Sequence, residues 1–94
     1  MEDILWFVFA GSRGGATRIE IVRALRERPR NANELATDLA YDYTTIRHHL
    51  DVLVENNVLR SVGDGYGDVY LLSEAMAAEQ ESLDRVLTAL EESR

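Results

Sequence analysis

The side chains best suited to chemistry are gathered in ten residues, Asp42 to Asp51, with the sequence Asp-Tyr-Thr-Thr-Ile-Arg-His-His-Leu-Asp. Arg47 supplies a guanidinium, which can donate two hydrogen bonds to O6 and N7 of guanine. Hydroxyls in the first turn of a helix, and the helix N-terminus itself, suit phosphate oxygens. The residue types of this stretch therefore predict contacts to nucleic acid.

The chain offers little support for catalysis or metal binding. His48 and His49 are adjacent, and successive helical side chains point about 100° apart, so the pair is poorly placed to chelate one ion. The sequence contains no cysteine, which excludes disulfides, thiolate metal sites and cysteine nucleophiles. The glycine-rich run at 11–15 lacks the lysine of a phosphate-binding loop. We therefore expect a protein that is not an enzyme and holds neither cofactor nor metal.

Amphipathic patterns predict two helices ahead of this stretch. Apolar residues recur at helical spacing from Ala16 to Arg28, and Pro29 follows where such a helix should end. Asn31, with Glu34 three residues later, is a capping-box signature for a short second helix.

The stretch itself predicts a third helix. Asp42 can cap its start, and Asn57 suits the left-handed backbone beyond its end. Helical spacing gives it an inward face of Ile46, His49, Leu50 and Leu53 and an outward face of Tyr43, Thr44, Arg47, His48 and Asp51. Residues 58–62 and 68–72 then predict a β-hairpin with a glycine-rich tip at 63–67.

Both ends of the chain predict packing elements. The apolar run from Ile4 to Ala10 is too short to span a bilayer, and it follows two acids rather than the basic start of a signal peptide. It predicts a buried first helix or strand in a cytoplasmic protein. The segment 73–92 predicts one helix with leucines at 83, 87 and 90. Such a seam favours a partner helix from a second chain, with packing on its own domain as the alternative.

The order helix, short helix, tight turn, capped helix and hairpin resembles a helix-turn-helix with a wing. The chain is similar to winged-helix transcription regulators of the ArsR type, particularly their archaeal form, in the segments GGATRIEIVRAL (14–25), NANELATDL (31–39), DYTTIRHHLDVLVENNVL (42–59) and GDGYGDVYLLS (63–73). The expected fold class is mainly α with a small β-hairpin. We expect one winged-helix domain over 1–94, with its core at 13–72 and dimerisation elements at 1–12 and 73–94.

The resemblance implies a homodimer that binds double-stranded DNA sequence-specifically and regulates transcription. The third helix, about 43–56, would enter the major groove, and the wing at 63–67 would lie on the flanking backbone. The candidate DNA contacts are Tyr43, Thr44, Thr45, Arg47, His48, Arg60, Tyr66, Arg13 and Arg18. The dimer interface that it implies is formed by Leu5, Val8, Leu83, Val86, Leu87 and Leu90.

Several of these residues have plainer alternatives. Arg47 can be a solvated arginine paired with Asp51, four residues on. Thr45 can belong to the helix cap, and His49 is better explained as a packed core histidine. Some ArsR-type regulators sense metals through cysteines or Asp/His/Glu clusters on the last helix, and this chain has no histidine or cysteine there.

The charge of the chain is unusual for a DNA-binding protein. Its net charge is −7, and all ten basic residues are arginine against seventeen acids. Residues 13–60 hold eight arginines against seven acids, whereas acids dominate 1–12 and 61–94. An acidic, lysine-free composition resembles that of proteins from salt-loving microbes, with an acidic protein from a GC-rich genome as the alternative. The acidity also leaves a second function open, a winged-helix module that binds another protein.

Overall fold

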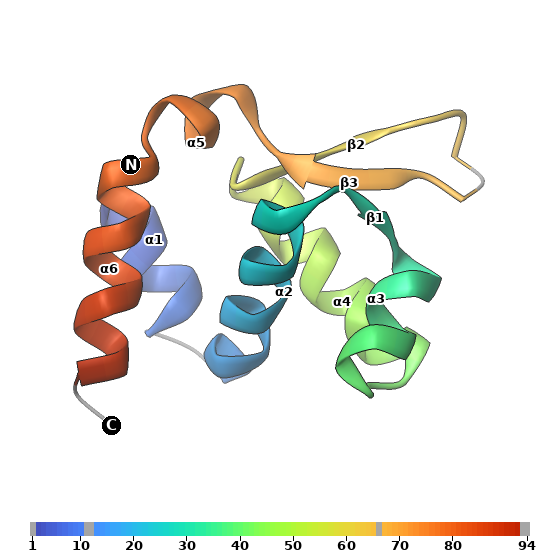
Figure 1. The fold of residues 1–94 in the computed structure, drawn as a ribbon, viewed down its shortest axis with the longest axis horizontal. Helices are drawn as coiled ribbons and strands as arrows, with labels where there is room; N and C mark the ends of the chain where they lie inside the picture. Colours follow the sequence, from blue (N-terminus) through green and yellow to red (C-terminus); the bar gives the residue numbers. More distant parts are fainter. Residues whose placement is uncertain (1, 11–12, 66, 93–94) are drawn as a thin grey trace.

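The computed structural model describes residues 2–10, 13–65 and 67–92, and Figure 1 draws its chain path. The elements are α1 (Glu2–Phe9), α2 (Gly15–Glu27), β1 (Arg30–Asn31), α3 (Ala32–Leu39), α4 (Tyr43–Glu55), β2 (Leu59–Val62), β3 (Val69–Leu72), α5 (Glu74–Ala78) and α6 (Gln80–Glu92). Helices make up most of the described chain, and the strands form one small antiparallel sheet. The predicted fold class, mainly α with a β-hairpin, is confirmed.

The sheet has the strand order β1-β3-β2. β2 and β3 form the predicted hairpin, in which Leu59 pairs with Leu72 and Val62 with Val69. The sequence did not predict β1, because two residues are too few to show an alternating pattern. Pairing with β3 creates this strand. In Figure 1 the hairpin extends past α4 and over α3.

Local capping sets the helix boundaries as the sequence predicts. The Glu34 N–H donates to Asn31 Oδ1 at 2.8 Å, and the Asn31 N–H donates to Glu34 Oε1 at 2.9 Å, which completes the capping box of α3. α2 ends at Glu27, two residues before Pro29. Asn57 has a φ of 58°, the left-handed conformation expected beyond the end of α4.

One continuous apolar core joins the helices to the sheet. The inward face predicted for α4 is confirmed, since Ile46, Leu50 and Leu53 are fully buried and His49 is 7% exposed. These apolar residues belong to a single cluster that also includes side chains of α1, α2, α3 and α6. α4 is therefore held along one side, which leaves its other side facing outward.

The C-terminal segment differs from the single long helix that we expected, because Glu79 separates α5 from α6. α6 lies beside α1 of the same chain (Figure 1). This packing buries most of the residues expected at a dimer interface within one subunit, namely Leu5, Val8, Leu83, Val86 and Leu87, and half-buries Leu90. α1 and α6 thus cover these side chains within one chain, which is the alternative that the sequence left open for the leucines of 73–92.

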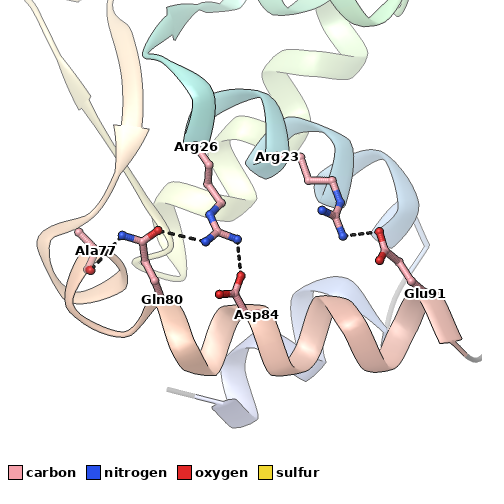
Figure 2. Close-up of polar contacts among 6 residues, drawn as sticks. All are labelled: Arg23, Arg26, Ala77, Gln80, Asp84 and Glu91. Atoms are coloured by element: carbon pink, nitrogen blue, oxygen red, sulfur yellow. Dashed lines mark hydrogen bonds and ion pairs between the residues drawn. The ribbon is translucent and has the colours of Figure 1, made fainter.

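Charged side chains tie α6 to α2 as well (Figure 2). Arg26 donates to Asp84 at 2.6 Å and to Gln80 at 3.2 Å, while Arg23 pairs with Glu91. The hydrogen bond from Arg26 lowers the pKa of Asp84. Exposed ion pairs contribute little to stability, so the buried leucines remain the main attachment of α6.

α1 confirms the first of the two elements predicted for the N-terminal run, a helix, but only one side of it is buried. Ile4, Trp6 and Phe7 are exposed, Phe7 by 58%. Adjacent large apolar side chains on an exposed helix form a candidate contact surface. Among the described residues, no helix is long and apolar enough to cross a membrane.

Replacing Leu87 with alanine should lower the free energy of unfolding by about 2–5 kcal/mol, because the change leaves a cavity between α6 and its neighbours. Leu87 is 2% exposed, whereas Leu90, three residues on, is only partly buried. Leu90→Ala should therefore destabilise the protein clearly less. Both losses are measurable by denaturant unfolding at one protein concentration. Equal losses would contradict the packing of α6 against its own chain.

Candidate nucleic-acid interface

The first turn of α4 is organised by the side chain of Asp42. Its Oδ1 accepts hydrogen bonds from the backbone N–H groups of Thr44 at 2.9 Å and Thr45 at 3.2 Å. Its Oδ2 accepts from the Thr45 hydroxyl at 2.6 Å. These bonds, that of the Thr45 hydroxyl foremost, lower the pKa of Asp42. The Thr45 hydroxyl thus completes the cap, the plainer of its two predicted roles.

The outward face of α4 carries the other predicted residues of this helix. Tyr43, Thr44 and His48 are exposed. The Arg47 guanidinium lies along the helix, with Nη1 3.5 Å from the Tyr43 hydroxyl and Nη2 3.9 Å from the Asp51 carboxylate. The Tyr43 hydroxyl is the main cause that raises the pKa of Arg47. Arg47 therefore carries a permanent positive charge, and its guanidinium is constrained by two long, weak contacts.

Arg47 stands where α4 meets the hairpin. On one side, a cleft of about 230 Å³ is lined by Asn31, Ala32 and Asn33 at the start of α3, by Tyr43 and Arg47, and by Gly65, Gly67, Asp68 and Tyr70 of the wing. On the other side, a cleft of about 320 Å³ reaches along α4 to Val54 and Glu55. A guanidinium with open space on two sides can reach a ligand without displacing the core.

The wing owes its shape to an acidic residue. Asp68 Oδ1 accepts a hydrogen bond from the Gly65 N–H at 2.7 Å. A Cβ on Gly63, whose φ is 146°, would lie 2.3 Å from the same oxygen, so the carboxylate is folded against the turn. Asp68 is thus a structural part of the wing. Tyr66, the predicted contact at the tip, lies outside the described residues.

The structure separates two predicted arginines from α4's outward face. Ser61 lines the cleft beside α4, so Arg60, one residue earlier in β2, lies on the opposite face of the hairpin. Arg18 was predicted as a phosphate contact, but it is 5% exposed, and burial lowers its pKa. It donates to His49 Nδ1 at 3.1 Å and to the Val8 carbonyl at 3.0 Å. The expectation for Arg18 is corrected, because these interior acceptors hold its guanidinium.

Comparison with known families and structures identifies the scaffold that presents this face. Residues 15–61, from the start of α2 into β2, match the sequence profile of a family described as "Bacterial regulatory protein, arsR family". The chain belongs to this family. Its family and fold are those of transcriptional regulators. The sequence matched no curated protein.

Solved structures of regulators share the winged helix-turn-helix fold. The homodimeric DNA-binding domain of a possible ArsR-family regulator from Mycobacterium bovis has a TM-score of 0.73 and 18% identity, over 93% of this chain and 77% of that one. An ArsR-like regulator from Rhodococcus sp. RHA1 has a TM-score of 0.65 and 27% identity, over 97% and 86%. The regulator HlyU from Vibrio vulnificus has a TM-score of 0.69 and 19% identity, over 89% and 84%.

Several arginines in the described part of this ArsR-family chain pair with side chains of other elements, so the slight basic excess of 13–60 does not gather on one face. Arg23 and Arg26 contact α6. Arg28 pairs with Glu34 and Asp38 of α3, and Arg30 also pairs with Asp38. Arg13, just before α2, is exposed and adjoins Gly14, which lies against His49 of α4. Sequence reasoning missed these pairings, because their partners come from other elements.

Carboxylates share the outward surface with Arg47. Asp51 and Glu55 are exposed on α4, and Asp68 borders both clefts. Among the described residues, no three His, Cys, Asp or Glu side chains are grouped so as to hold a metal ion. The surface therefore combines one central guanidinium with hydroxyls, an imidazole and flanking acids.

Proposed function

We propose that this ArsR-family chain is a transcription regulator that binds double-stranded DNA sequence-specifically as a homodimer. The observation that carries the proposal is the outward face of α4, where Arg47 stands between two clefts on a helix held along its opposite side. In a helix-turn-helix, this helix is the one that lies in the major groove. The proposal includes a cytoplasmic location, with access to the DNA.

Each candidate DNA-contact residue on the outward face of α4 has a contact that its chemistry suits. Arg47 would donate to O6 and N7 of a guanine. The hydroxyls of Tyr43 and Thr44, beside the positive end of the α4 dipole, would contact phosphate oxygens, and His48 would contact a base or phosphate. The wing at 63–67 and Arg13 would lie against the flanking backbone. We leave Arg18 out of these contacts because it is buried, and Arg60 because it lies on the face of the hairpin opposite the cleft beside α4.

We propose that two copies associate through the exposed side of α1, which replaces the leucine seam expected from the sequence. Ile4, Trp6 and Phe7 supply the apolar surface. Leu90 of α6, which is only partly buried within its own chain, would add to it. The homodimeric domain from Mycobacterium bovis shares the fold over most of both chains, which supports a dimer here. Twofold symmetry would place two half-sites about one helical turn apart.

The small number of arginines available for phosphate contacts suits DNA binding at high salt. A protein with few arginines directed at phosphates releases few counterions on binding, so salt weakens its affinity less than usual. The lysine-free, acidic composition agrees with an origin in a salt-loving archaeon, which belongs to this proposal. The same acids favour the second candidate function, a module that binds a protein through the face of α4.

Arg47→Ala should abolish or strongly relax the sequence preference while leaving the fold intact. A good bidentate arginine–guanine contact discriminates by about 1–3 kcal/mol. The measurement is selection of bound duplexes from a random DNA library, at moderate and multimolar KCl. Arg85→Ala is the matched control, since it removes one exposed arginine that pairs with Glu2 on α1, away from α4.

A twofold-symmetric motif that the control enriches and Arg47→Ala does not would support Arg47 as the base-reading residue. Enrichment of an unchanged motif by Arg47→Ala would contradict that assignment. If the folded protein enriches no motif at either salt, DNA recognition is wrong and the protein-binding function takes its place.

Phe7→Glu should convert the dimer into a folded monomer, because it introduces a charge into the apolar surface proposed as the interface. Light scattering coupled to size exclusion gives the mass, and circular dichroism checks the fold. Val62→Glu is the control, since Val62 is also apolar and 50% exposed but lies on β2. A Phe7→Glu protein that stays dimeric would contradict the proposed α1 interface.

A further inference from the structure

Arg18 links three helices that have separate tasks in the proposed function. It lies in α2, and its Nε donates to His49 Nδ1 on α4 at 3.1 Å. One of its terminal nitrogens donates to the carbonyl of Val8, in the last turn of α1, at 3.0 Å. Val8, Arg18 and His49 are all buried. This side chain therefore connects the helix proposed for dimerisation with the helix proposed for DNA reading.

From this geometry we propose that Arg18 and His49 are positioning residues that fix α4 relative to α1, and that protonation of His49 breaks their contact and weakens DNA binding. The inference rests on the proposed function. It adds a pH-dependent control of DNA binding through α4, exerted by residues that do not contact DNA.

The contact requires a neutral imidazole. His49 Nδ1 accepts from Arg18, so in the neutral ring the proton lies on Nε2. A protonated ring carries N–H donors on both nitrogens and has no acceptor to offer. Protonation would therefore set an N–H donor and a positive charge against the Arg18 guanidinium at the distance of the present hydrogen bond.

The surroundings of His49 do not compensate such a charge. The groups that act on the ring are Arg18 of α2 and His48 of α4, and both disfavour a positive charge. The centroid of the His48 ring lies 5.3 Å from that of the His49 ring, in an edge-on arrangement. α1 presents the Val8 carbonyl, which accepts from Arg18. Burial, then Arg18, then His48 lower the pKa of His49.

The ring has little room to turn away. Gly14 has a φ of 86°, and a Cβ there would lie 2.4 Å from His49 Cε1 and 3.2 Å from Nε2. At Gly15 an added Cβ would meet the Phe9 carbonyl at 2.1 Å. The end of α1, the start of α2 and the middle of α4 are thus in close contact. A displaced His49 ring would shift these segments, and with them the angle between α1 and α4.

The sign of the pH effect follows from the lowered pKa. Neutral His49 contributes stability that is fully present above the ordinary histidine pKa of about 6.5 and is lost as the pH falls towards the lower folded value. In the proposed complex DNA holds α1 and α4 in one fixed relation, which lowers the pKa of His49 below its value in the free folded protein. DNA affinity should therefore fall as the pH drops below the folded pKa of free His49, by roughly tenfold for each unit by which DNA binding further lowers that pKa.

The test compares DNA affinity at pH 7.5 and 5.5 for the full chain, using the duplex most enriched by selection at pH 7.5. His49→Asn keeps an acceptor oxygen near the position of Nδ1 but cannot titrate, so its affinity should not fall with pH. Arg85→Ala is the control, because it removes an exposed arginine of α6 that pairs with Glu2 and contacts neither His49 nor the proposed DNA-reading face. It should retain the fall.

An affinity that stays level or rises towards pH 5.5 in the wild type overturns the inference, as does an equal fall in His49→Asn. If His49→Asn does not fold, the Cε1–H resonance of each histidine can be followed by NMR in wild-type protein. His49 must then titrate below the ordinary histidine pKa of about 6.5, and lower still with DNA bound. DNA binding at pH 7.5 that does not change with pH would contradict this inference and leave the proposed function standing. Absence of DNA binding at pH 7.5 would contradict both.

Discussion

Burial of Ile46, Leu50 and Leu53 fixes the rotation of α4 about its own axis. These side chains lie in the core that joins α4 to the sheet and the other helices, so Tyr43, Thr44, Arg47 and His48 are directed to the opposite side. The Asp42 cap fixes where the helix begins. The proposed DNA-reading surface is thus a consequence of apolar packing on the far side of the same helix. The contact of Arg18 with His49 extends this constraint to α1, because one buried guanidinium holds both helices.

Several arginines of this chain contact other elements of the same chain and are not directed at a ligand. Arg23 and Arg26 hold α6, Arg28 and Arg30 pair with acids of α3, and Arg18 is internal. Arg47 is the guanidinium that remains at the centre of α4's outward face. With one guanidinium at the centre of this face, counterion release would contribute little to the proposed DNA affinity. Under the proposal, specific contacts to base edges and the fit of α4 in the groove would supply more of it.

Much of the fold could be predicted from local chemistry. The capping box of Asn31, the cap of Asp42 and the left-handed Asn57 depend on residues a few positions apart, and each is present. The inward and outward faces of α4 follow from helical spacing alone. The misses depend on long-range contacts. The leucines of α6 pack on α1, Arg18 reaches His49 thirty-one residues away, and β1 exists only by pairing with β3. A periodic pattern shows that a face is apolar but does not identify the partner that covers it.

Methylation interference on the selected duplex tests most directly whether α4 lies in the major groove of a twofold-symmetric site. Methylation at guanine N7 blocks the major-groove acceptor that Arg47 is proposed to contact, whereas methylation at adenine N3 obstructs the minor groove. We expect modified N7 positions to block binding at two symmetric sites about 10–10.5 base pairs apart. Interference confined to adenine N3, or to one unrepeated position, would contradict a dimer that reads DNA with α4.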